Sequence, residues 1–252
     1  MIKINITELL EIAKEAGKGI LDIYNKPLEE LEISLKADSS PLTIADKISH
    51  DIIVNGLEKL FPFIPILSEE GKDIPYDTRK NWEYYWCIDP LDGTKEFINK
   101  NGEFTVNIAL IHNNIPVLGI IYLPVVNTIY YGSSETGSWK ISKEKPERLE
   151  ADIHATEWIS IGSRSHASTE EAGLLSKYPV VRSVSAGSSL KFCMIAEGKA
   201  HIYYRHGPTM EWDTAAGHAI AINSGANVTH LDGSEFTYNK PSLLNQSFLC
   251  KI

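Results

Sequence analysis

Apolar residues recur every three or four positions in two segments near the start of the chain. This spacing predicts one helix from Asn5 to about Asn25, with Asn5 and Glu8 in a capping-box pattern at its start. A second helix is predicted over about residues 43–60, and Pro62 lies just beyond its end. We expect the apolar faces of both helices to pack on a β-sheet.

The pattern changes to alternation of apolar and polar residues between about Trp82 and Trp139. Strands are predicted at residues 105–111, 116–122 and 127–131, with short turns between them. Because short connections join neighbouring antiparallel strands, this region is expected to form an antiparallel meander.

Residues 142–150 are charged and lack periodicity, so we expect the boundary between two tightly packed halves here, 1–145 and 146–252. After this segment, predicted strands alternate with predicted helices. The alternation indicates helices layered on a second sheet, and hence a mixed α/β (α+β) protein. The strands are expected at 158–161, 180–184 and 201–204, and the helices at about 168–175, 189–197 and 213–224.

Composition narrows the classes of protein and partner. The chain has 252 residues, 43% of them hydrophobic, which suits a globular protein with a substantial core. A net charge of −9 without a basic cluster disfavours a nucleic acid polymer as partner. Cys87, Cys193 and Cys250 are widely spaced among apolar neighbours, which is typical of reduced core cysteines in a cytoplasmic protein. The absence of eighteen consecutive apolar residues predicts no membrane span, and leaves peripheral association with the inner membrane open.

The run Asp89-Pro90-Leu91-Asp92-Gly93-Thr94 follows an apolar stretch at residues 84–88 and holds the most informative candidate chemistry. Pro90 and Gly93 interrupt regular structure, so both carboxylates can point into one small space. Two like charges so close repel unless a cation lies between them. Mg²⁺ prefers such oxygen ligands and often shares them with a phosphate, so metal-assisted phosphate chemistry is predicted. An ordinary surface turn is the alternative.

Two further acidic sites lie at the ends of apolar elements. Ser68-Glu69-Glu70-Gly71 ends the run 64–67, and Trp212-Asp213-Thr214 opens a helical pattern. We expect all three acidic sites to converge on one pocket. Asp213 is equally explained as a helix N-cap, and the residue pattern does not decide whether Glu69 or Glu70 faces inward.

The three acidic motifs, Ser68-Glu69-Glu70, Asp89–Thr94 and Trp212–Gly217, resemble the three signatures of the inositol monophosphatase superfamily. The similarity covers nearly the whole chain. Within that superfamily, three further segments resemble the bacterial 3'(2'),5'-bisphosphate nucleotidases more than the inositol phosphatases. These segments are Lys95-Glu96-Phe97, Ser163-Arg164-Ser165-His166 and Gly187–Cys193.

The resemblance implies a layered α-β-α-β-α sandwich with the site between its halves. It also implies Mg²⁺-dependent, lithium-sensitive removal of the 3'-phosphate from 3'-phosphoadenosine 5'-phosphate (PAP), giving AMP, in sulfur metabolism. Action on the sulfated nucleotide is left open. We expect a small-molecule nucleotide substrate and a monomer or weak dimer. The alternatives are an inositol monophosphatase or other sugar phosphatase, and a non-catalytic nucleotide-binding regulator that keeps the fold.

The resemblance also implies metal ligands. Glu69, Asp89 and the Leu91 carbonyl would hold one Mg²⁺. Asp89 would share a second ion with Asp92 and Asp213, and two or three ions are expected in all. A metal pair of this kind suits in-line phosphoryl transfer.

Asp46 and Thr94 would position the attacking water, although Asp46 also completes a capping-box pattern with Thr43. Ser188 and Lys191 lie where a helix begins, which suits a phosphate, and Arg205 and His166 would add contacts. A cap, solvated charges and a loop histidine are the alternatives for these four. Substrate contacts are thus expected from Glu69, Leu91, Asp92, Gly93, Thr94, His166, Ser188, Lys191, Arg205 and Asp213.

Overall fold

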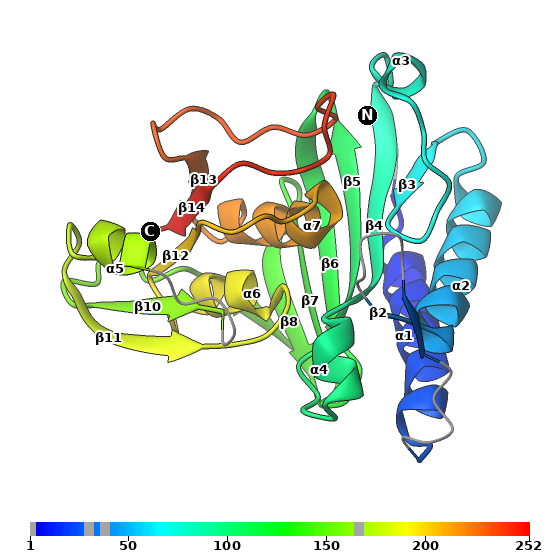
Figure 1. Ribbon diagram of the computed structural model, residues 1–252, viewed down its shortest axis with the longest axis horizontal. Helices are drawn as coiled ribbons and strands as arrows, with labels where there is room; N and C mark the ends of the chain where they lie inside the picture. The colour runs from blue at the N-terminus through cyan, green and yellow to red at the C-terminus, as the bar shows by residue number, and fades with distance from the viewer. Residues whose placement is uncertain (1–3, 28–32, 36–40, 164–168) are drawn as a thin grey trace.

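Helices and β-sheets alternate in layers through the molecule (Figure 1). The computed structural model describes residues 4–27, 33–35, 41–163 and 169–252. Within these ranges, a seven-stranded sheet and a five-stranded sheet have helices between them and on their outer faces. This arrangement confirms the α-β-α-β-α sandwich.

Two long helices cover the outer face of the seven-stranded sheet, as their apolar faces predicted (Figure 1). They are α1 (Ile6–Tyr24) and α2 (Ile44–Leu60). The Asn5 side chain caps α1 by accepting the N–H of Thr7 at 3.2 Å. A short antiparallel pair of strands, β1 (Ile33–Leu35) and β2 (Pro41–Thr43), leads into α2.

Among the described residues, the structure contains no helix with the length and apolar character of a membrane span.

The seven-stranded sheet has its strands in chain order. The first pair is parallel and every later pair is antiparallel, which confirms the predicted meander. Short helices α3 (Tyr76–Arg79) and α4 (Thr94–Ile98) flank the second strand. The strands are β3 (Ile66–Ser68), β4 (Tyr84–Asp92), β5 (Thr105–His112), β6 (Ile115–Leu123), β7 (Thr128–Ser133), β8 (Gly137–Ser142) and β9 (Lys145–Leu149).

Residues 142–150, for which the sequence pattern predicted no helix or strand, contain a strand. β8 and β9 form a hairpin there, in which Ser142 lies opposite Lys145. β9 is an edge strand whose first four residues are exposed and whose last, Leu149, is buried. A strand that faces solvent on both sides carries charged residues and no apolar alternation, so the pattern does not reveal it.

The five-stranded sheet has the order β11-β10-β12-β14-β13. β10 lies between β11 and β12 and is parallel to both. The chain runs from β10 to β11 on one side and then to β12 on the other side of β10, which makes a topological switch point. In α/β sheets, ligands bind outside the carboxyl ends of strands at such a switch point. The strands are β10 (Trp158–Gly162), β11 (Val180–Ser185), β12 (Ile202–Arg205), β13 (Asn227–His230) and β14 (Phe248–Lys251).

Helices α6 (Leu190–Ala196) and α7 (Glu211–Ile222) fill the layer between the sheets, and α5 (Thr169–Leu175) packs on the outer face of the second sheet. Nine residues of α7 are buried. Gly119 in β6 permits close approach of this helix, because a Cβ there would lie 2.2 Å from the Ala216 carbonyl oxygen.

We predict that Gly119→Ala lowers the free energy of unfolding by ~1–3 kcal/mol, because the added methyl must push α7 away from the sheet. Gly173→Ala in α5 is the matched control, since nothing lies within 4 Å of the Cβ position there. The control should leave stability unchanged or raise it by ~0.5–1 kcal/mol. Urea unfolding measures both, and equal effects would contradict the packing argument.

Candidate active site

Glu69 and Asp89 lie side by side because β3 and β4 are adjacent and parallel, with Glu69 directly after β3 and Asp89 within β4. Ser68 of β3 is in register with Ile88 of β4, and the Glu69 N–H donates to the Ile88 carbonyl at 3.2 Å. The residues that follow Ser68 and Ile88 are Glu69 and Asp89, so the two acids lie next to each other where β3 ends.

A β-bulge in β4 brings Asp92 to the same face as Asp89. Asp89 lies opposite Asn107, and Asp92 lies opposite Thr105. Between these two pairs, β4 therefore contains one residue more than β5. Residues three apart in a regular strand point to opposite faces, and the extra residue corrects this. Ser49 donates to the Pro90 carbonyl at 2.7 Å and holds the bulge. The predicted turn at residues 89–94 is thus a bulge followed by Gly93, whose φ is +93°.

Asp213 is not a helix N-cap. α7 begins at Glu211, so Asp213 lies in the first turn, and its carboxylate accepts the N–H of Met210 at 2.8 Å. This bond satisfies one of the free amides at the start of the helix and fixes the carboxylate.

Carboxylate oxygens of Glu69, Asp89 and Asp213 all lie within 4.8 Å of one another. Glu69, rather than Glu70, joins this acidic cluster. Burial raises the pKa of Asp89 well above its usual value, and the charges of Glu69 and the other acids add to the effect. Burial, followed by the charges of Asp92 and Glu69, likewise raises the pKa of Asp213. A hard divalent cation would relieve this repulsion, so the cluster fits a metal site.

Asp92 is held by two residues that sequence reasoning missed for this position. Its carboxylate accepts the Ser189 hydroxyl at 2.6 Å and the Asn107 amide at 3.3 Å. The same Ser189 oxygen lies 3.0 Å from the Asp213 carbonyl oxygen. Ser189 therefore links acids from the two halves of the chain. No local pattern reveals these contacts, because they join residues 15 to 97 positions apart.

Asp46 uses its two carboxylate oxygens for different partners. Oδ2 accepts the Thr43 N–H at 2.8 Å and the Thr43 hydroxyl at 2.6 Å, which completes the cap of α2. Oδ1 accepts the Thr94 hydroxyl at 3.3 Å. Capping and contact with Thr94 therefore coexist in one buried carboxylate.

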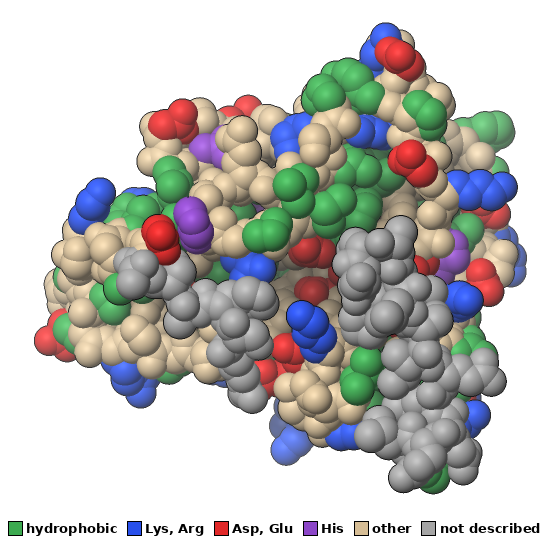
Figure 2. Space-filling model, viewed as in Figure 1, with side chains coloured by type: hydrophobic (Ala, Val, Ile, Leu, Met, Phe, Trp, Pro, Cys, Tyr) green, Lys and Arg blue, Asp and Glu red, His purple; other side chains and the backbone are tan. Residues whose placement is uncertain are grey.

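A cavity of about 180 Å³ lies beside the acids and has a basic side. Figure 2 shows acidic groups at the floor of a central recess with basic side chains next to them. His166 lies outside the described residues. The candidate residues that line this cavity, called the 180 Å³ cavity below, are Asp92, Gly93, Lys95, Glu96, Ser163, Ser188, Lys191, Arg205 and Asp213.

Lys191 and Ser188 both form hydrogen bonds within the protein, so they are not simply solvated surface groups. Lys191 is buried, its ammonium donates to the Ser188 carbonyl at 2.6 Å, and burial lowers its pKa. The Ser188 hydroxyl donates to the Glu103 carbonyl at 2.9 Å, which holds the loop. The Arg205 guanidinium donates to the Pro208 carbonyl at 3.2 Å, while its Nε is buried without a partner among the described residues.

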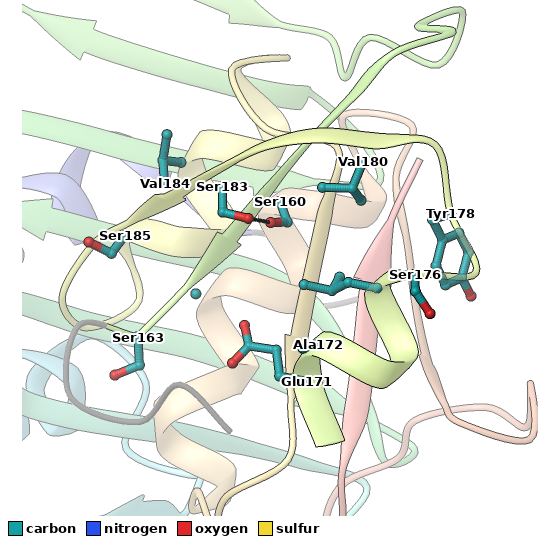
Figure 3. Close-up of a pocket in the computed structure, with 12 residues that line it drawn as sticks. Ser160, Ser163, Glu171, Ala172, Ser176, Tyr178, Val180, Ser183, Val184 and Ser185 are labelled. Carbon is teal, nitrogen blue, oxygen red and sulfur yellow. Dashed lines mark hydrogen bonds between the residues drawn. The ribbon is translucent and has the colours of Figure 1, made fainter. Parts of the chain in front are cut away.

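A second cavity, of about 790 Å³, lies between α5 and the strands β10 and β11. Figure 3 shows Glu171 reaching into it from α5 and the Ser160–Ser183 hydrogen bond, of 2.7 Å, joining the two strands. Ser163 lines this cavity and the 180 Å³ cavity, so the two adjoin at the end of β10.

The fold and the acidic motifs have known relatives. The profile of the inositol monophosphatase family matches residues 5–249. The 3'(2'),5'-bisphosphate nucleotidase CysQ of Salmonella typhimurium is 45% identical over 251 residues, which cover 98% of this chain and 99% of that protein. CysQ of Escherichia coli K12 is 44% identical over 252 residues, with the same coverage.

Solved structures agree with these similarities. The crystal structure of CysQ from Bacteroides thetaiotaomicron, a bacterial member of the inositol monophosphatase family, superimposes with a TM-score of 0.85. It is 43% identical and covers 97% of this chain and 96% of its own. An IMPase from Thermotoga maritima shares the fold at 20% identity, with a TM-score of 0.79 over 98% of this chain and 91% of its own. The chain therefore belongs to the inositol monophosphatase family.

Proposed function

We propose that this protein is a Mg²⁺-dependent 3'(2'),5'-bisphosphate nucleotidase that converts PAP to AMP and phosphate. The observation that carries the proposal is the cluster of the buried Asp89 with the partly buried Glu69 and Asp213, beside a cavity that Lys191 and Arg205 line. The names of the relatives at 44–45% identity support the same activity. Action on the sulfated nucleotide belongs to the proposal as a secondary activity.

The donor set suits two or more Mg²⁺ ions. Glu69, Asp89 and the Leu91 carbonyl would hold one ion, and Asp89 with Asp92 and Asp213 a second. When bound, Mg²⁺ supplies Lewis-acid activation of water and stabilises the leaving oxygen. The raised pKa values of Asp89 and Asp213 support this role, because burial and, after it, the charges of the neighbouring acids disfavour their ionised forms, and bound cations would favour these forms.

The pair Asp46 and Thr94 would orient the attacking water. Asp46 accepts a hydrogen bond from the Thr94 hydroxyl, which leaves the lone pairs of that oxygen free to face the site. The Thr94 oxygen would then accept a hydrogen bond from water and aim the water at phosphorus. This is a contribution of orientation, since the other Asp46 oxygen is occupied by the helix cap.

A nucleotide fits the basic side better than an inositol phosphate does. Ser163 and Arg205 lie at the carboxyl ends of β10 and β12, at the switch point of the second sheet. Lys191 and Arg205 suit a second phosphate, which PAP has and inositol 1-phosphate lacks. The adjoining 790 Å³ cavity offers room for further parts of a larger substrate.

We further propose a cytoplasmic enzyme that acts as a monomer or weak dimer. The three free, buried cysteines support a reducing compartment.

Substrate preference separates this proposal from the sugar phosphatase alternative. We expect kcat/KM for PAP to exceed that for inositol 1-phosphate by more than ~10-fold, because only PAP uses both basic side chains. Phosphate release from both substrates at saturating Mg²⁺ measures the ratio. A preference for inositol 1-phosphate would refute the nucleotide assignment, and binding of PAP without turnover of either substrate would favour the non-catalytic regulator.

Asp89→Asn should lower turnover by more than ~100-fold, since Asp89 would bridge both ions. A loss of ~100-fold is the upper end for mutations of residues that only support metal ligands. In metal-free protein the same change should raise the melting temperature. The raised carboxyl pKa of Asp89 means that its contribution to stability is present at low pH and is lost as pH rises through that pKa. The gain should therefore be larger at pH 8 than at pH 5.

Thermal unfolding in EDTA and in Mg²⁺ checks this prediction. The Mg²⁺-induced rise in melting temperature should vanish in Asp89→Asn and persist in Asp51→Asn, whose carboxylate is exposed on α2. Near-normal turnover of Asp89→Asn with an intact Mg²⁺ response would contradict the bridging role.

The two roles of Asp46 are separable through its partners. Thr94→Val should cut kcat by ~100-fold or more with little change in stability, because it removes the water-orienting hydroxyl. Thr43→Ala should cost ~1 kcal/mol of stability as a lost cap and leave most of the activity. Steady-state kinetics beside urea unfolding test the pair. Full activity of Thr94→Val would rule out the proposed orientation.

A further inference from the structure

Glu211 is a fully buried carboxylate two residues before Asp213. Its Oε1 accepts the Lys240 ammonium at 2.7 Å and the Lys240 N–H at 3.0 Å. Its Oε2 accepts the Asn239 N–H at 2.8 Å and the Tyr85 hydroxyl at 3.3 Å. One carboxylate thus joins the first turn of α7 to residues 239–240 and to β4.

Asn245 holds the residue that binds the Asp213 carboxylate. Its amide donates to the Met210 carbonyl at 2.7 Å, and its own Oδ1 accepts the Lys240 ammonium at 3.1 Å. The Met210 N–H is the donor to Asp213. Lys240 is therefore connected to Asp213 by a continuous chain of hydrogen bonds.

Asn239 extends the same network to the segment that follows Glu69. The Arg79 guanidinium donates to Asn239 Oδ1 at 2.9 Å and to the Pro241 carbonyl at 3.0 Å. The Asn239 side-chain amide in turn donates a hydrogen bond to the Arg79 carbonyl at 2.8 Å. Arg79 is 2% exposed, so these bonds form away from bulk water.

Glu211 and residues 239–245 together therefore contact each chain segment that delivers an acid to the cluster. Tyr85 lies on β4, the strand of Asp89, Arg79 ends α3 in the segment after Glu69, and Glu211 starts the helix of Asp213. None of the residues in this network belongs to the acidic cluster itself. Ligands held to within about 0.5 Å by such supporting bonds are what a tight metal site requires.

We propose that the ion pair between the buried Glu211 and the partly buried Lys240 is a positioning pair, which orients Asp213 towards Glu69 and Asp89 and thereby sets the affinity for metal. This inference rests on the metal dependence in the proposed function. An ion pair that takes a carboxylate out of water adds little stability over an apolar pair of similar size, so a role limited to packing would not require these charges. Lys240 also neutralises a carboxylate that would otherwise add negative charge beside the cluster.

The test compares Lys240→Met with Lys240→Arg, which keeps the cation, and with Glu197→Gln as control. Glu197 is a similarly engaged carboxylate, bonded to Tyr130 and Lys140 at the end of α6 away from Lys191. Mg²⁺ is titrated while the melting temperature is followed, which reports metal binding without substrate. The metal-free melting temperature reports stability separately.

We expect the Mg²⁺ concentration for half of the thermal shift to rise ~10–100-fold in Lys240→Met, and Lys240→Arg to recover most of the loss. Saturating Mg²⁺ should restore much of the turnover in Lys240→Met. Glu197→Gln should lower the metal-free melting temperature and leave the half-saturation unchanged.

An unchanged half-saturation in Lys240→Met, together with a lower melting temperature, would overturn the positioning role. If Lys240→Met does not fold, the milder Arg79→Lys replaces it. This change removes the guanidinium that bonds to both Asn239 and Pro241, and it should likewise raise the Mg²⁺ concentration for half of the thermal shift. A wild-type protein without any Mg²⁺ response would instead refute the metal dependence itself, so the two failures are distinguishable.

Discussion

Mutual repulsion among closely spaced carboxylates is the constraint on which this structure depends. Glu69, Asp89 and Asp213 are held together, although burial and like charge both raise the pKa of Asp89 and of Asp213. Such an arrangement persists only where the backbone over-determines it. Parallel strands fix the first two acids, and the first turn of α7 fixes the third.

The surrounding polar groups serve the same end. Ser189 joins Asp92 to the backbone of α7, Glu211 joins α7 to β4, and Asn239 joins α7 to α3. The acids come from both halves of the chain, so the site forms only when the two sheets and the helices between them are packed. Rigid elements hold the negative charges, and cations can then enter a preformed site.

Much of the fold follows from local patterns. The two N-terminal helices and the meander agree with prediction because amphipathic helices and alternating strands carry periodic signals. β9 gave no such signal, since a strand with exposed residues on both faces needs no apolar alternation. The start of α7 was placed two residues late, because Glu211 is charged and reads as a surface residue although it is fully buried.

The sequence by itself determined the family and the set of acids, because the order and spacing of Glu69, Asp89, Asp92 and Asp213 are local motifs. It also indicated two roles for Asp46, a helix cap from the residue pattern and a water-positioning role from the family resemblance. Tertiary structure decided that the helix cap and the contact with Thr94 coexist in Asp46, that the bulge turns Asp92 to the side of Asp89, and that Ser189 and Asn107 bond to Asp92. These contacts join residues far apart in the chain, and their geometry exists only once strands, helices and loops have packed together.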